Sequence, residues 1–158
     1  METPEYIHAE RTALRLIARA EQCSAGLARK LEKRGHNEDC ARKVISHLIE
    51  LNLLNDSRYA RFWLQSRLRF TRSPRQLLSS LCAKGVERAE AEAALKSILD
   101  EETETSLMER FVKKHKKKAG KSGDVTRSLK HVLKNEGFSY QVIQNFLETQ
   151  NISESSGE

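Results

Sequence analysis

The chain has 158 residues and a hydrophobic fraction of 38%, which suits one compact domain or a short array of small units. Seven glycines and only two prolines, among many Leu, Ala, Lys, Arg and Glu residues, predict an all-α protein. The formal net charge of +6 indicates an anionic partner, either nucleic acid or an acidic protein surface, or a basic balance that only aids solubility.

The cysteines exclude a disulfide framework. Cys23, Cys40 and Cys82 are odd in number and scattered, and no C-x-x-C pair occurs. His36 stands four residues before Cys40, but no second pair of ligands completes a tetrahedral zinc site, so we expect no metal and no other cofactor. No apolar run is long enough for a signal peptide or a membrane span, and we therefore expect a cytoplasmic protein without membrane contacts.

Three short segments share one helical pattern that ends in glycine. The glycines are Gly35, Gly85 and Gly137, which recur at intervals of about 50 residues. A leucine stands eight and four residues before each glycine, so each segment predicts a short helix with a narrow apolar stripe that ends at a left-handed residue. The predicted N-caps are Ser24, Ser73 and Asp124, with Pro74 at the first helical position after Ser73, and the leucines are Leu27 and Leu31, Leu77 and Leu81, and Leu129 and Leu133.

A longer helix is predicted before each segment and an amphipathic helix after each glycine. The chain therefore predicts an all-α fold of three tandem three-helix repeats that form an elongated, curved array. The repeats span residues 1–54, 55–102 and 103–150, and residues 151–158 are expected to form a disordered tail. The residues expected to face inward after the glycines are Ala41, Val44, Ile45, Leu48, Ala91, Ala94, Leu95, Ile98, Ile143, Phe146 and Leu147.

The stretch from Arg58 to Arg75 contains six arginines and no acidic residue. Four of these arginines gather on one face at helical spacing, and arginine suits bidentate contacts with phosphate or carboxylate. One of them could instead form an internal ion pair, for which Asp56 is close in sequence to Arg58. The predicted binding surface comprises Arg58, Arg61, Arg69 and Arg72.

Three aromatic residues gather on another face of the same stretch. Tyr59, Trp63 and Phe70 could stack on the bases of a single strand. Their spacing is that of a helical core face, which favours burial over stacking.

The stretch from Lys113 to Asp124 reads KKHKKKAGKSGD and contains AGKS, the end of a phosphate-binding loop. Such a loop needs a glycine five residues before Gly120, where His115 stands, and an apolar strand before it, which is missing. We therefore predict a loop between Val112 and Val125 that is either merely solvated or a patch for DNA phosphates or acidic protein groups. The basic residues of this region are Arg110, Lys113, Lys114, Lys116, Lys117, Lys118 and Lys121.

Two ordered sets of residues in the first and second repeats form a recognisable pattern. In the first repeat, ALRLIARAEQCSAGLARKLEKRG from Ala13 to Gly35 contains an Ala-Leu helix, a polar turn and a Leu-Ala-Arg-Lys-Leu helix ending in glycine. In the second repeat the set comprises Asp56, Arg58, Tyr59, Ala60, Leu81, Lys84, Gly85 and Val86. In these residues the chain resembles the RecX family of recombinase regulators. The resemblance covers roughly residues 9–147 and is weakest in the third repeat.

The resemblance implies a non-enzymatic regulator that binds the filament of the RecA recombinase. It implies modulation, mainly inhibition, of the ATPase, strand-exchange and coprotease activities of RecA. Since some members of the family bind DNA directly, single-stranded or duplex DNA is a further expected partner, bound weakly and without sequence specificity. The protein is expected to act as a monomer.

Two other functions stay open at this point. One is a helix-turn-helix-like DNA-binding protein that acts independently of RecA, because three-helix units with a glycine turn suit that class. The predicted helix after Gly85 is acidic and the one after Gly137 has no Lys or Arg, so only the helix with Arg42 and Lys43 could enter a groove. The other is a helical scaffold for some other acidic protein.

Overall fold

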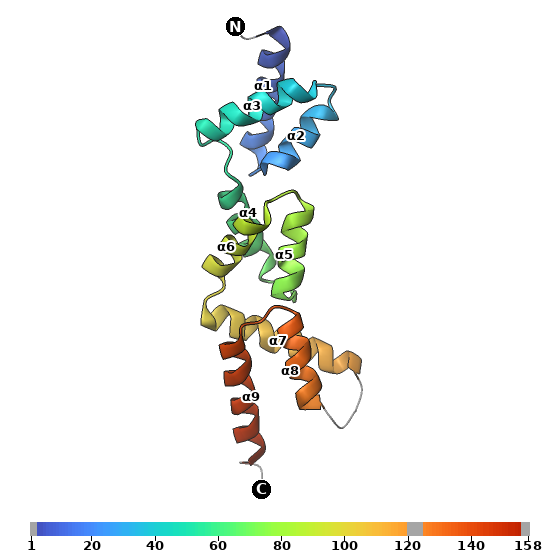
Figure 1. Ribbon diagram of the computed structural model, residues 1–158, viewed down its shortest axis with the longest axis vertical. Coiled ribbons are helices and arrows are strands. Elements are labelled where there is room, and N and C mark those ends of the chain that lie inside the picture. The colour runs from blue at the N-terminus through green and yellow to red at the C-terminus, as the bar shows by residue number, and fades with distance from the viewer. Residues whose placement is uncertain (1–2, 120–124, 156–158) are drawn as a thin grey trace. The chain divides into compact units, whose positions relative to one another are not determined.

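The computed structural model describes residues 3–119 and 125–155, and within these ranges the chain forms nine α-helices and no strand (Figure 1). The predicted all-α fold is confirmed. The helices, labelled in chain order in Figure 1, are α1 Pro4–Arg19, α2 Ser24–Glu32, α3 Glu38–Glu50, α4 Asp56–Arg67, α5 Pro74–Ala83, α6 Arg88–Ile98, α7 Glu101–Ala119, α8 Val125–Asn135 and α9 Tyr140–Ser155.

The three glycine turns form as the sequence predicts. Gly35, Gly85 and Gly137 follow α2, α5 and α8 with φ angles of 88°, 97° and 86°. A residue with a Cβ adopts this left-handed conformation only at a cost, which explains the choice of glycine. In each turn the N–H of the residue after glycine bonds to the carbonyl of the second stripe leucine, which is Leu31, Leu81 or Leu133.

The starts of α2 and α5 differ from each other. Ser73 caps α5: its Oγ accepts the N–H of Gln76 at 3.2 Å, and the Oε1 of Gln76 accepts the N–H of Ser73 at 3.0 Å. The prediction that Ser24 caps α2 is wrong, because Ser24 is the first helical residue and Cys23 is the N-cap. The carboxylate of Asp56 accepts both the N–H and the hydroxyl of Ser24, so a group from α4 replaces a local cap. The third predicted N-cap, Asp124, lies outside the described residues.

The chain forms two compact units. The first contains residues 1–63 and 80–94, and the second contains residues 64–79 and 95–158. Each unit holds parts of α4, α5 and α6, so the division into units does not follow the predicted repeats. The boundaries of the three repeats stay a prediction from the sequence.

In the first unit, α1 and α2 both pack against α3. Leu27, Leu31, Val44 and Leu48 are at most 1% exposed and form the centre of this core. The faces predicted for α2 and α3 are thus confirmed. Alanine at positions 9 and 13 of α1, fully buried, allows the helix to approach this core closely.

In the second unit, α7 and α8 both pack against α9. Leu107 and Met108 of α7 and Leu133 of α8 are fully buried. Glu104 of α7 is also buried, and its carboxylate accepts the N–H of Ser139 at 2.6 Å and the hydroxyl of Ser139 at 3.0 Å. This carboxylate therefore caps α9 and ties its start to α7.

Two helices extend beyond the predicted limits. α7 continues to Ala119, through much of the loop predicted between Val112 and Val125, because a run of lysines ending in alanine has a high helix propensity. α9 continues to Ser155, so it covers the first residues of the predicted disordered tail.

Candidate functional site

Arg58 belongs to the scaffold of the first unit. Its Nε donates to the carboxylate of Glu21 at 2.7 Å, and its two Nη atoms donate to the carbonyls of Asn52 and Leu53, each at 3.2 Å. An internal ion pair thus exists, but its partner is Glu21 rather than Asp56. Because each of the three guanidinium nitrogens is bonded within the fold, we leave Arg58 out of the candidate surface.

The other three predicted arginines are exposed. Arg61 lies on α4 in the first unit, whereas Arg69 and Arg72 lie between α4 and α5 in the second unit. α4 ends at Arg67, so the four predicted arginines do not share one helical face.

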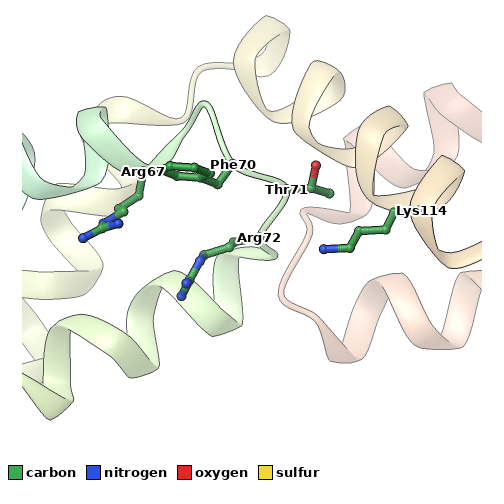
Figure 2. A pocket seen from close by; sticks show the side chains of 5 residues that line it. All are labelled: Arg67, Phe70, Thr71, Arg72 and Lys114. Atoms are coloured by element: carbon green, nitrogen blue, oxygen red, sulfur yellow. The ribbon is translucent and has the colours of Figure 1, made fainter.

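A cationic depression lies in the second unit (Figure 2). It has a volume of about 420 Å³ and is lined by Arg67, Phe70, Thr71, Arg72 and Lys114. In Figure 2, Lys114 points from α7 toward the side on which Arg72 and Phe70 lie. No carboxylate is among the lining residues. The depression therefore suits an anionic group such as a phosphate or a carboxylate.

Phe70 places an aromatic ring among these cations. It is 44% exposed, so its expected burial is wrong. The guanidinium carbons of Arg67 and Arg69 lie 5.9 Å and 4.9 Å from the centre of its ring, within the range of cation–π attraction. The exposed ring could stack on a flat group of a ligand.

The segment from Leu68 to Ser73 carries Arg69, Phe70 and Arg72 and is bonded at both ends to other parts of the second unit. Arg110 of α7 donates to the carbonyl of Leu68 at 2.8 Å and to the carbonyl of Arg69 at 3.2 Å. At the other end, the buried hydroxyl of Ser73 donates to the carboxylate of Glu136, which follows α8. The depression is thus built on a connection that is held in place.

The lysines predicted as a patch extend from this depression along α7. Lys113, Lys114 and Lys116 are exposed. Lys114 also lines a second hollow, of about 270 Å³, together with Phe111 and His115. The remaining predicted lysines are Lys117 and Lys118 in the last turn of α7 and Lys121, which lies outside the described residues.

The sequence did not reveal the structural positions of two arginines. Arg67 lines the depression, and its position inside the arginine-rich stretch was the available signal. Arg110 was grouped with the exposed lysines, but its guanidinium points inward to backbone carbonyls. Arg110 stands at the same offset before Gly137 as Arg58 before Gly85, but the two arginines bond carbonyls of different connections, so the repeat register alone does not give its role.

Two further possibilities are a membrane-spanning helix and a metal site. Within the residues that the structure describes, no helix is long and apolar enough to cross a membrane. The same residues contain no group of three or more His, Cys, Asp or Glu side chains that could hold a metal ion.

Comparison with known proteins gives consistent matches. The family model described as RecX, second three-helix domain, matches residues 55–95. The regulatory protein RecX of Treponema pallidum is 34% identical over 140 residues, which are 88% of this chain and 83% of that protein. The regulatory protein RecX of Caldanaerobacter subterraneus is 30% identical over 139 residues, 88% of this chain and 68% of the relative. The crystal structure of RecX from Lactobacillus salivarius has the same fold, with a TM-score of 0.72 at 22% identity over 94% of this chain and 97% of that one.

Proposed function

The chain belongs to the RecX family, a family of regulatory proteins rather than enzymes, and from this premise we propose that it binds the filament that the RecA recombinase forms on DNA. Bound there, it modulates and mainly inhibits the ATPase, strand-exchange and coprotease activities of RecA. It acts as a cytoplasmic monomer and uses no cofactor.

The cationic depression of the second unit is the observation that carries this proposal. Arg72 and Lys114 reach it from separate parts of the chain, and the exposed ring of Phe70 lies between charged side chains. An anionic ligand in the depression is attracted by several cations at once. DNA phosphates and the carboxylates of a protein surface both meet this requirement, and a filament of protein on DNA offers both.

Contacts of these cations with DNA phosphates would give affinity without sequence preference. Such contacts release counterions, so binding to DNA alone weakens steeply as salt rises. We assign to the anionic partner Arg69, Arg72, Lys113, Lys114 and Lys116 of the second unit and, as a separate contact, Arg61 of the first unit. Lys117, Lys118 and Lys121 stay in this assignment as a prediction from the sequence.

The test is the single-stranded-DNA-dependent ATPase of RecA from the same organism, titrated with this protein. We expect hydrolysis to fall when the protein is present at less than one copy per RecA subunit. A parallel anisotropy titration of the protein with DNA alone, at two salt concentrations, separates filament binding from DNA binding. Unchanged hydrolysis together with tight, salt-sensitive DNA binding would overturn the proposal and favour a DNA-binding protein that acts independently of RecA.

A further inference from the structure

The connection between α4 and α5 bears Phe70 and Arg72 of the depression and Arg69 beside them, and it is bonded to α7 and to the residue that follows α8. We propose that Arg110 is a positioning residue, which holds the segment Leu68–Ser73 in the conformation that presents Arg69, Phe70 and Arg72 to the anionic partner. The expected effect of Arg110 on filament binding rests on the proposed function, whereas its expected effect on the segment Leu68–Ser73 does not.

Arg110 is directed at the backbone and not at solvent. Its two Nη atoms donate to the carbonyls of Leu68 and Arg69, and its Nε is buried without a hydrogen-bond partner. These carbonyls lie directly after the end of α4, where backbone acceptors lack partners within the helix. A planar guanidinium can bond two successive carbonyls at once, which a lysine cannot do with the same geometry.

The far end of the segment is fixed by α8. Besides the bond from the Ser73 hydroxyl to Glu136, the N–H of Arg75 donates to the carbonyl of Glu136 at 2.9 Å. A Cβ at Gly137 would stand 3.4 Å from the backbone nitrogen of Arg75, so the two backbones approach closely. Between these two anchors the segment cannot shift without breaking bonds at one end.

The first unit contains a similar contact, which holds the connection before α4 rather than the one after it. Arg58 occupies the matching position before Gly85 and also donates from its two Nη atoms to successive carbonyls, those of Asn52 and Leu53. The segment that it holds carries no arginine or lysine. The arrangement is therefore a recurring way to hold a connection, and in the second unit it fixes a connection that carries charge.

A fixed segment matters for binding because side chains that are already in place lose less entropy when the ligand arrives. If Arg110 no longer holds the two carbonyls, Arg69 and Arg72 keep their charge but lose their common geometry. The expected effect is weaker binding with an unchanged number of surface cations.

The first test is native-state proteolysis by trypsin, with the rate of cleavage after Arg69 and after Arg72 followed by mass spectrometry. The variants are R110Q and R110K, with R127Q as a control that removes an exposed arginine of α8 from the same unit. We expect cleavage after Arg69 and Arg72 to accelerate by roughly tenfold or more in R110Q, since two bonds from a charged donor are lost, and to stay unchanged in R127Q. R110K should lie between them.

Two proteolysis outcomes overturn the proposal. One is unchanged cleavage in R110Q. The other is an equal acceleration at all tryptic sites, which would mean that Arg110 only stabilises the fold.

The second test is inhibition of the RecA ATPase by the same variants. R110Q should need about tenfold more protein for half-inhibition, as the lost hydrogen bonds imply, whereas R127Q should match the wild type. Full activity of R110K would show that only the charge of Arg110 matters, and this would overturn the positioning role. If the wild-type protein leaves the ATPase unchanged, the proposed function fails, while the proteolysis result still decides whether Arg110 holds the segment.

Discussion

Replacing Ser73 by alanine should destabilise the protein considerably more than replacing Ser24. Ser73 is fully buried, caps α5 and donates its hydroxyl to the carboxylate of Glu136, whose side chain is only 18% exposed. Loss of the cap costs about 1 kcal/mol. Loss of a hydrogen bond to a charged acceptor costs about 1.5–3 kcal/mol, since no water replaces the hydroxyl at a buried site. We therefore expect S73A to lower the free energy of unfolding by about 2–4 kcal/mol.

Ser24 offers a matched comparison because its hydroxyl also donates to a carboxylate, that of Asp56, at 2.9 Å. It is not the N-cap of α2, it is only half-buried, and the backbone N–H that also binds Asp56 remains in S24A. The expected loss is about 1 kcal/mol. Urea denaturation followed by far-ultraviolet circular dichroism measures both variants. Equal losses would refute the reasoning, as would a cycle of S73A and E136Q with no coupling energy between the two sites.

Three further predictions concern charge, backbone conformation and pH. The double variant R69E/R72E should keep its helical circular dichroism but lose most of its inhibition of the RecA ATPase; unchanged inhibition would exclude these arginines from the surface. In thermal unfolding, G85A should be destabilised by roughly 2–4 kcal/mol, because the added Cβ would lie 2.4 Å from the Cβ of Ala25 and the φ angle of Gly85 is 97°. G35A, with open space around it, should lose only about 1 kcal/mol, and equal losses would show that the turn alone matters. Hydrogen bonds from the hydroxyl and the N–H of Thr103 lower the pKa of Asp100. The stability that this carboxylate contributes is therefore present above the ordinary aspartate pKa near 4 and is lost as the pH falls through its own, lower pKa. A titration of the Asp100 carboxyl by NMR at or above the ordinary value would contradict this.

The helical scaffold could be predicted because its signals are local. A glycine after a leucine stripe defines both the inward face and the end of a helix within one short segment, and Leu27, Leu31, Leu77 and Leu81 are all fully buried. The start of α2 was misplaced by one residue because Asp56, distant in the sequence, supplies the acceptor that a local cap would have provided. Local rules cannot anticipate a partner that arrives through the tertiary fold.

The candidate site was harder to predict than the fold, because a charged residue can be bonded within the protein and is then not available to a ligand. The stretch from Arg58 to Arg75 looks uniform, yet Arg58 is bound to Glu21 and to backbone carbonyls, and Arg75 lies 3.5 Å from the carboxylate of Glu136. Helical periodicity also failed beyond Arg67, where α4 ends and the connection begins. The spacing of arginines could not show which of them face a partner.

The hydrogen bonds of the structure resolve part of this ambiguity. Arg58 and Arg110 each donate to two successive backbone carbonyls, Arg58 in the connection before α4 and Arg110 in the connection after it. Arg69 and Arg72 are exposed and stand in the connection that Arg110 holds. In a chain with a net charge of +6, the exposed cations, rather than those that hold the backbone, are therefore the first candidates for contact with an anionic partner.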